Sequence, residues 1–150
     1  MQQKINIVNK KAKFEYHLMD QFTAGIQLSG TEIKSIRNNK ASIAEAYCVV
    51  SDGEVFIRNM QIQAYENSSF YNHKLKRDRK LLLNRKEIDK LEKFMKDKGN
   101  TIVPLKMFIS DKGWAKLVIS TAKGKKLYDK RNDLKDKDDK RAMDRAMKRF

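Results

Sequence analysis

The sequence has little of the chemistry that builds metal, redox or disulfide sites. It contains one cysteine, Cys48, and two histidines, His17 and His73, which lie far apart along the chain. A zinc site needs closely spaced Cys and His ligands, so we expect no metal site. A single cysteine fits a reducing compartment. We interpret Cys48 as a small core residue, because apolar neighbours flank it.

Long apolar runs are also missing from the sequence. No run approaches the ~20 residues that a membrane-spanning helix needs. The first residues show no apolar segment that leads to a small-residue cleavage site. We therefore expect neither a membrane partner nor a signal peptide, and a cytoplasmic location.

Neither the phosphate-binding pattern GxxxxGK[ST] nor the dinucleotide pattern GxGxxG occurs. Carboxylate pairs such as Glu32 with Glu45, or Asp20 with Glu15, are consistent with a metal-dependent nuclease. Each of these side chains is better explained as a helix cap or a solvated charge. The sequence thus favours a binding protein over an enzyme, with no cofactor.

Positive charge is what the sequence has in excess. Its 150 residues carry a formal net charge of +15, and the isoelectric point is about 9.9. A charge of this size in a small protein indicates a polyanionic partner, most often a nucleic acid.

The first third of the chain alternates apolar and polar residues, which is typical of strands. Phe14–Leu18 and Phe22–Leu28 are expected as two strands joined by a tight hairpin at Asp20-Gln21, and residues 1–13 as a mobile arm or an edge segment. A short helix is then expected from Thr31, its N-cap, to about Asn38. In this helix Glu32, Lys34 and Arg37 would face outward, and a further helical turn is expected at Ser42–Glu45.

The rest of the chain up to Ala122 contains clear turn and cap signals. Asp52-Gly53 predicts a hairpin between Tyr47–Val50 and Val55–Met60, and Asp111-Lys112-Gly113 predicts another between Thr101–Ser110 and Trp114–Ala122. Asn84 with Glu87 predicts a capped helix that ends at Gly99. Pro104 lacks an N–H, so its strand segment is expected at a sheet edge.

Together these elements predict a mainly β domain over residues 1–122. We expect an antiparallel β-barrel of OB type with embedded short helices. Residues 123–150 have almost no apolar surface to bury, so we expect a disordered basic tail. Met143, Met147 and Phe150 recur at helical spacing, which indicates that a partner could fold this tail.

Basic residues interleave with aromatic ones at Asn9–Phe14, at Phe70–Lys80 and in the tail. Cations neutralise phosphates and aromatic rings stack on unpaired bases, which favours RNA. The stretch Gln63–Lys80 is either a functional loop or a disordered one, and its aromatic rings either stack on bases or pack on the domain. The candidate RNA-binding side chains from these patterns are Lys10, Lys11, Lys13, Phe14, Lys34, Arg37, Arg77, Arg79 and Lys80.

Four runs of the sequence resemble the SsrA-binding protein family, small protein B of bacterial trans-translation. They are NKKAKFEY from Asn9, AGIQLSGTEIKSIR from Ala24, RKLLLNRKEIDKL from Arg79 and AKGKKLYDKR from Ala122. The runs follow the family's order over nearly the whole chain, and GTEIKSIR and GKKLYDKR are highly specific.

The resemblance implies an oligonucleotide-binding barrel with a tail that is unstructured in free solution. Members of the family bind the tRNA-like domain of tmRNA. With elongation factor Tu and GTP, they deliver tmRNA to stalled ribosomes for peptide tagging and ribosome rescue. The tail is expected to enter the empty mRNA channel near the decoding centre, beside small-subunit rRNA, and to become helical there. The protein is expected to act as a monomer.

The resemblance also implies roles for particular residues. Asn9, Glu32 and Leu82 match family positions tied to tmRNA contact, whereas Thr23 and Phe14 stand where relatives commonly carry Glu and His. A general RNA-binding module or RNA chaperone without a ribosomal role remains the alternative. The residues that match the family's ribosome motif are Gly124, Lys125, Lys126, Tyr128, Asp129, Lys130 and Arg131.

Overall fold

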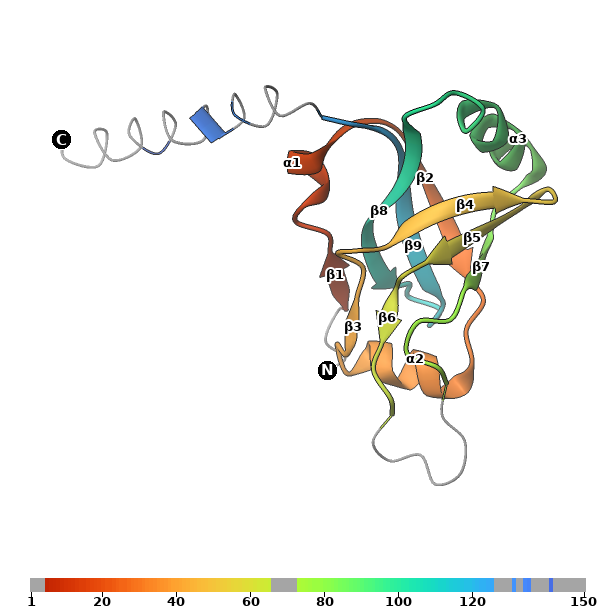
Figure 1. Cartoon of the computed structure of the whole chain (residues 1–150). Coiled ribbons are helices and arrows are strands. Elements are labelled where there is room, and N and C mark those ends of the chain that lie inside the picture. The colour runs from red at the N-terminus through yellow and green to blue at the C-terminus, as the bar shows by residue number, and fades with distance from the viewer. Residues whose placement is uncertain (1–4, 66–72, 126–130, 132–133, 136–140, 142–150) are drawn as a thin grey trace.

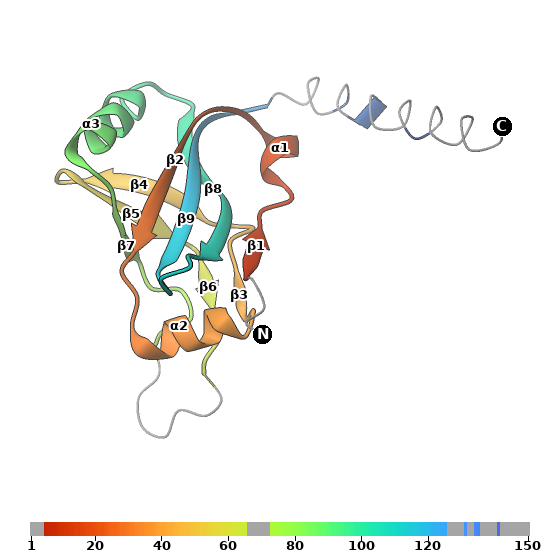
Figure 2. The same ribbon diagram turned by 180° about the vertical axis from the view of Figure 1, so that it is seen from behind.

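A computed structural model describes residues 5–65, 73–125, 131, 134–135 and 141 of the chain. The described residues form antiparallel strands with three short helices, as Figures 1 and 2 show from opposite sides. The mainly β prediction with embedded short helices is therefore confirmed. The elements are β1 Asn6–Val8, α1 Ala12–Glu15, β2 Tyr16–Ile26, α2 Gly30–Arg37, β3 Ala41–Ser42, β4 Tyr47–Ser51, β5 Glu54–Arg58, β6 Gln61–Ile62, β7 Arg79–Leu82, α3 Arg85–Phe94, β8 Asn100–Ile109 and β9 Ala115–Gly124.

The pairings of the main sheet close on themselves. Its strand order is β1-β8-β4-β5-β7-β2-β9, and β9 also pairs with β8, so the strands from β8 to β9 form a ring. The fully buried side chains of Ile57, Ile102, Leu117 and Ile119 belong to one hydrophobic cluster. Burial of this apolar surface is the main favourable term for folding. Strands β3 and β6 form a separate small sheet.

The predicted hairpin at Asp20-Gln21 is wrong, because β2 runs through this point as one strand. It pairs with β9 on both sides of an irregularity between Leu18 and Gln21. The backbone N–H of Asp20 donates to Thr121 Oγ1 at 2.9 Å. This dipeptide lacks the Gly or Asn that a tight hairpin needs, and a β-bulge uses its extra residue instead.

Both glycine-containing hairpins are confirmed. Asp52 and Gly53 have positive φ angles of 51° and 73° between β4 and β5. Gly113 has a φ of 87° in the loop that joins β8 to β9. The strand β8 has partners on both sides, but the segment at Pro104 pairs with β9 alone, because β1 pairs with β8 at residues 106–108 and β4 pairs with it at Ile102. The prediction that this part of the strand lies at an edge is therefore confirmed, and the missing N–H of Pro104 is tolerated there.

The helix at Asn84 is confirmed with its capping box, since Glu87 N–H donates to Asn84 Oδ1 and Asn84 N–H donates to Glu87 Oε1. The helix α3 ends at Phe94, before Gly99. Three other local predictions are wrong. The N-cap of α2 is Ser29 rather than Thr31, Phe14 belongs to α1 rather than to a strand, and Ser42 ends β3 instead of starting a helical turn.

The described part of the N-terminal segment forms the edge strand β1, which pairs with β8. The last strand, β9, extends two residues beyond the expected boundary at Ala122. Among residues 131, 134–135 and 141 the backbone is helical and the side chains are exposed. No helix among the described residues is long and apolar enough to cross a membrane.

Candidate nucleic-acid interface

Asn9 anchors the turn that carries the first basic cluster. Its backbone N–H donates to Leu105 O at 2.8 Å, and its Nδ2 donates to Pro104 O at 2.9 Å. These bonds fix the chain where it leaves β1 and enters α1. As a result, Lys10, Lys11 and Lys13 project from a rigid turn and are exposed. Asn9 itself is only 8% exposed.

The short helix α1 is held on the domain by a small apolar cluster. Ala12 packs with Val103 of β8 and Ala122 of β9, and Tyr16 and Leu18 pack against them. Ala12, Val103 and Ala122 are almost completely buried. This contact places the residues of α1 beside the start of β4.

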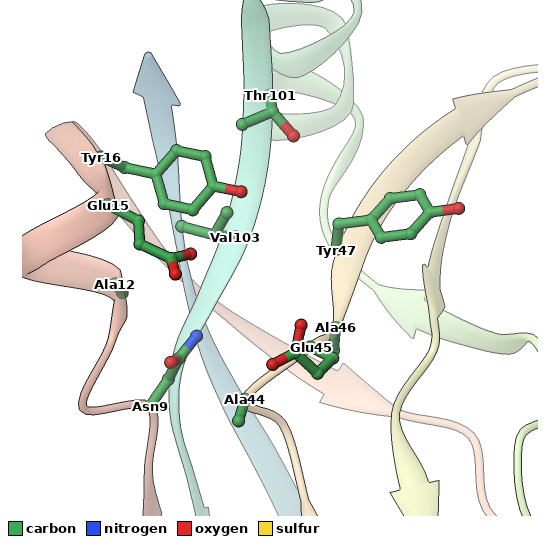
Figure 3. A pocket seen from close by; sticks show the side chains of 10 residues that line it. All are labelled: Asn9, Ala12, Glu15, Tyr16, Ala44, Glu45, Ala46, Tyr47, Thr101 and Val103. Carbon is green, nitrogen blue, oxygen red and sulfur yellow. The ribbon is translucent and has the colours of Figure 1, made fainter. Parts of the chain in front are cut away.

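A pocket of about 240 Å³ lies between α1, the start of β4 and β8. Figure 3 shows the side chains of Asn9, Glu15 and Glu45 pointing toward its centre, with the ring of Tyr16 at one side. Burial, together with the Glu15 and Glu45 carboxylates, raises the pKa of Tyr16, so its hydroxyl stays protonated at neutral pH. At the rim, Lys11 Nζ lies 3.1 Å from Glu45 Oε1.

The second group of predicted residues surrounds Glu32 in α2. The prediction that Glu32 faces outward is wrong, because its side chain is fully buried. Glu32 is the third residue of α2 and reaches back to the N–H of the cap residue Ser29, at 2.9 Å. Arg77 donates to both carboxylate oxygens, with the shortest distance 2.6 Å. Arg79 Nε donates to Oε2 from inside the domain.

Arg79 is fully buried as well, and its guanidinium is used entirely within the protein. It donates to Glu32, to Met60 O at 2.8 Å and to Arg77 O at 3.1 Å. Burial lowers the pKa of Arg79, and the Glu32 carboxylate opposes this change. Arg79 therefore ties α2 to the chain around β6 and β7 rather than presenting a charge at the surface.

The charge state of Glu32 follows from its partners. Burial alone would raise its pKa, but the hydrogen bonds from Arg77, the Ser29 backbone and Arg79 outweigh burial and lower the pKa to about 2. Glu32 is therefore ionised at neutral pH and offsets one of the two positive charges of Arg77 and Arg79.

The exposed members of the second group lie around α2 and β7. Lys34 Nζ lies 5.4 Å from the centroid of the Tyr65 ring. Arg37 is exposed, and a Cβ atom built on Gly113 would lie 3.8 Å from its guanidinium. Lys80 Nζ donates to Glu54 Oε1 at 3.0 Å. Leu82 is 53% exposed beside a pocket of about 510 Å³, and it packs over Gly25.

The structure thus separates the predicted residues into two groups. Asn9, the lysines that follow it and Phe14 gather around α1, where Lys125 N–H also donates to Glu15 O at 2.9 Å. Glu32, Arg77, Arg79 and Lys34 gather around α2, at the opposite end of the molecule (Figures 1 and 2). In the tail motif Gly124 and Arg131 are exposed, and Lys126, Tyr128, Asp129 and Lys130 lie outside the described residues.

Tyr47 and Trp114 are exposed aromatic residues that were not among the predicted site residues, and Trp114 is the more exposed of the two. Trp114 is 66% exposed at the end of the β8–β9 loop. The sequence pattern predicted only that a strand starts there. Its position directly after Gly113 could have indicated exposure, because a large ring at the end of a hairpin loop is seldom buried in the core.

The described residues contain no cluster of three or more His, Cys, Asp or Glu side chains that could hold a metal ion. Cys48 is fully buried, and burial raises the pKa of its thiol. The exposed cations described above are suited to hold an anionic partner.

Comparisons with known proteins agree with this description. A family model described as SmpB protein matches residues 6–149. An SsrA-binding protein of Bacteroides thetaiotaomicron is 55% identical over 148 residues, which cover 99% of each chain. One from Listeria welshimeri is 50% identical over 140 residues, which cover 93% of this chain and 90% of that protein. A chain in the solved structure "tmRNA-SmpB: a journey to the center of the bacterial ribosome" has a TM-score of 0.70 and 36% identity, and covers 82% of this chain and 86% of that one.

Proposed function

The chain belongs to the SmpB family of SsrA-binding proteins, and on this premise we propose that it binds tmRNA and acts with it on stalled ribosomes in trans-translation. The observation that carries the proposal is the extent of the match, since one family model spans residues 6–149, the tail included. The family's members are RNA-binding proteins and not enzymes, and the net charge of +15 suits an RNA partner.

In this proposal the closed ring of strands is an OB-type barrel that holds the tRNA-like domain of tmRNA. Such barrels bind nucleic acid on one face and its neighbouring loops. The exposed and half-buried cations, the half-buried Phe14 and the exposed Leu82 are the residues that we assign to RNA contact. They are Lys10, Lys11, Lys13, Phe14, Lys34, Arg37, Arg77, Lys80 and Leu82.

Three predicted residues take a different role in the proposal, because their side chains are buried. Asn9 positions the lysines that follow it through its bonds to Pro104 and Leu105. Glu32 and Arg79 position Arg77 and the end of α2 through their ion pair. Their substitution would therefore weaken RNA binding by displacing neighbouring groups.

The tail from residue 123 is assigned to the ribosome. We place Gly124, Lys125, Lys126, Tyr128, Asp129, Lys130 and Arg131 at the decoding centre, beside small-subunit rRNA, and the residues beyond them in the empty mRNA channel. A basic segment with little apolar surface has no reason to fold before a polyanion neutralises it. Elongation factor Tu with GTP would join through the tmRNA complex, with this chain as a cytoplasmic monomer.

A gel-shift comparison tests the RNA partner. The full-length chain is titrated against the tRNA-like domain of tmRNA and against an ordinary elongator tRNA at the same moderate salt concentration. The proposal expects clear preference for the tRNA-like domain. Equal affinity for both RNAs and for an unrelated hairpin would instead identify a general RNA-binding module or chaperone.

A further inference from the structure

The largest aromatic side chain of the described residues lies outside the core. Trp114 is 66% exposed at the end of the β8–β9 loop. Its ring makes no contact with another ring or with a cation among the described residues. The backbone below it is nevertheless fixed, because Trp114 N–H donates to Ser110 Oγ at 3.1 Å and Ser110 N–H donates to Trp114 O at 2.8 Å. The hairpin therefore presents this ring to solvent from a rigid base.

Trp114 lies at one end of an outward face of the sheet. Leu117 of β9 is in the core, and successive side chains of a strand point to opposite faces, so Lys116 points outward. Phe108 of β8 is paired with Lys116 and lies on the same face. Lys106 lies there too, with its Nζ 5.9 Å from the centroid of the Phe108 ring. Together with Trp114, two residues before Lys116, these side chains form the outer β8–β9 face.

The outer β8–β9 face combines the two kinds of group that hold single-stranded RNA, which are aromatic rings and cations. Phe108 and Trp114 are diagonal neighbours across the two strands, about 7–8 Å apart. Lys106 and Lys116 form no ion pair with a described carboxylate, so both charges are available to phosphates. In the adjoining loop, the exposed charges of residues 111 and 112 offset each other.

This face continues across β2 to Leu82 of β7, a residue already assigned to RNA contact. Lys116 is paired with Gly25 of β2, and Gly25 is paired with Leu82. Figure 2 shows β2, β9 and β8 side by side. A Cβ atom built on Gly25 would lie 3.3 Å from Leu82 Cβ, so the glycine leaves room for Leu82 beside the strand. Continuity with this contact and the unpaired lysines favour RNA as the occupant of the face.

We propose that the outer β8–β9 face binds unpaired bases of an RNA strand, with Trp114 and Phe108 stacked on bases and Lys106 and Lys116 beside the flanking phosphates. Bases inside a duplex are already stacked on both sides, so the face requires a single-stranded segment. Both RNAs of the proposed function, tmRNA and rRNA, offer this chemistry. The inference rests on the proposed function only in taking RNA as the partner.

The fluorescence of the wild-type chain tests this face directly. Trp114 is the only tryptophan in the sequence, so tryptophan emission of the full-length chain reports on this position alone. The chain is titrated with a ten-nucleotide RNA strand of mixed sequence and with the same strand annealed to its complement, at equal phosphate concentration. Stacking should quench the emission with the single strand and much less with the duplex. Unchanged emission at saturation with the single strand, or equal quenching by both, would overturn the proposal.

Two folded RNAs then identify the source of the bases. The same titration uses the tRNA-like domain of tmRNA and a hairpin from the decoding region of small-subunit rRNA. Quenching by either supports the proposal and assigns the face to that RNA, whereas bound RNA without quenching in both cases contradicts it. Unquenched emission with an intact preference for the tRNA-like domain would leave the proposed function standing. Loss of that preference with quenching by the ten-nucleotide strand would leave the face standing.

Variants of the ring measure its contribution. Trp114→Ala should weaken binding of the ten-nucleotide strand at least about fivefold, whereas Trp114→Phe keeps a stacking ring and should stay within about threefold of wild type. Tyr47→Ala is the control, because Tyr47 is 38% exposed outside this face and should contribute less than about twofold. Circular dichroism checks that each variant is folded. A Trp114→Ala chain that binds like wild type, or a loss of equal size for Tyr47→Ala, would contradict the proposal.

The salt dependence of binding tests the cations of the face. Lys116→Gln should reduce the magnitude of the slope of log affinity against log salt concentration by about 0.7, the value for one phosphate contact on a single strand. Lys90→Gln removes an exposed cation of α3 and should leave the slope unchanged. An unchanged slope for Lys116→Gln would show that no phosphate lies beside this lysine and would contradict the proposed placement of the strand.

Discussion

Glu32 belongs to a family sequence motif and also stabilises the fold. It lies in the run GTEIKSIR, caps its own helix and holds two arginines from a distant part of the chain. An acidic residue in the first turn of a helix normally faces solvent, which is why the sequence pattern predicted an exposed side chain. The Glu32 side chain can be buried because Arg79, forty-seven positions away in the sequence, supplies the opposite charge inside the domain.

Substituting Glu32 should be strongly destabilising. Glu32→Gln leaves the buried Arg79 without its counter-charge, and loss of one partner from a buried pair typically costs about 3–5 kcal/mol. Glu54→Gln is the matched control, because the Lys80–Glu54 pair is partly exposed and should contribute less than about 1 kcal/mol. Urea denaturation of both variants gives the free energies of unfolding. A Glu32→Gln cost no larger than that of Glu54→Gln would contradict the structural role.

The same residue should make stability depend on pH in the acid range. The pKa of Glu32 is lowered in the folded protein from its usual 4.5 to about 2. A lowered folded-state pKa adds stability above the unfolded-state pKa, and this stability is lost as pH falls toward the folded-state value. The difference in unfolding free energy between wild type and Glu32→Gln should be constant above about pH 5.5 and shrink between about pH 4.5 and 2. A pH-independent difference would exclude this linkage.

At the scale of elements, the hairpins form where the local residues predict them, whereas the extent of the long strands differs from the local prediction. The turns at Asp52-Gly53 and Gly113 need positive φ, which the residues themselves provide. By contrast, β2 continues through Asp20-Gln21 because β9 pairs with it on both sides. Pairing partners far away in sequence decide whether an interruption becomes a turn or a bulge.

Two glycine substitutions should show which glycine the backbone conformation requires. Gly113→Ala places a Cβ at a φ of 87° and should destabilise the β8–β9 hairpin by about 1 kcal/mol. Gly30→Ala lies in the first turn of α2 with nothing within 4 Å of the added Cβ, so it should be neutral or stabilise by up to about 1 kcal/mol. Thermal unfolding followed by circular dichroism measures both. A Gly113→Ala variant as stable as wild type would show that the hairpin does not depend on this glycine.

At the scale of the whole molecule, two basic groups lie at opposite ends of one ring of strands. The tail leaves from the end that carries α1, where Lys125 N–H is bonded to Glu15 O. This arrangement would let the two basic groups hold one RNA while the tail, which leaves from the α1 end, reaches another. The positive charge of the whole sequence supplies attraction to both RNAs.

Removing the tail should separate the two activities. A chain ending at Lys125 keeps β9 and every other strand of the ring, so its affinity for the tRNA-like domain should stay within about threefold of full length. Peptide tagging on stalled ribosomes in a purified translation system should be abolished, because the residues assigned to the decoding centre from Lys126 onward are absent. Tagging at the full-length rate would show that the assignment of the tail is wrong.

The sequence by itself determined the strand-rich class, the turn and cap positions at Asp52-Gly53, Gly113 and Asn84, and the polyanionic partner. The turns and caps depend on the backbone preferences of a few adjacent residues. The polyanionic partner follows from the net charge, which is a sum over the whole sequence and does not depend on how the chain folds. Only the tertiary structure decided that Glu32 and Arg79 are buried, that β2 continues through Asp20-Gln21, and that Asn9 is buried beside Glu15 and Glu45. Burial and convergence depend on residues distant in the chain, and no local pattern specifies which distant residues will meet.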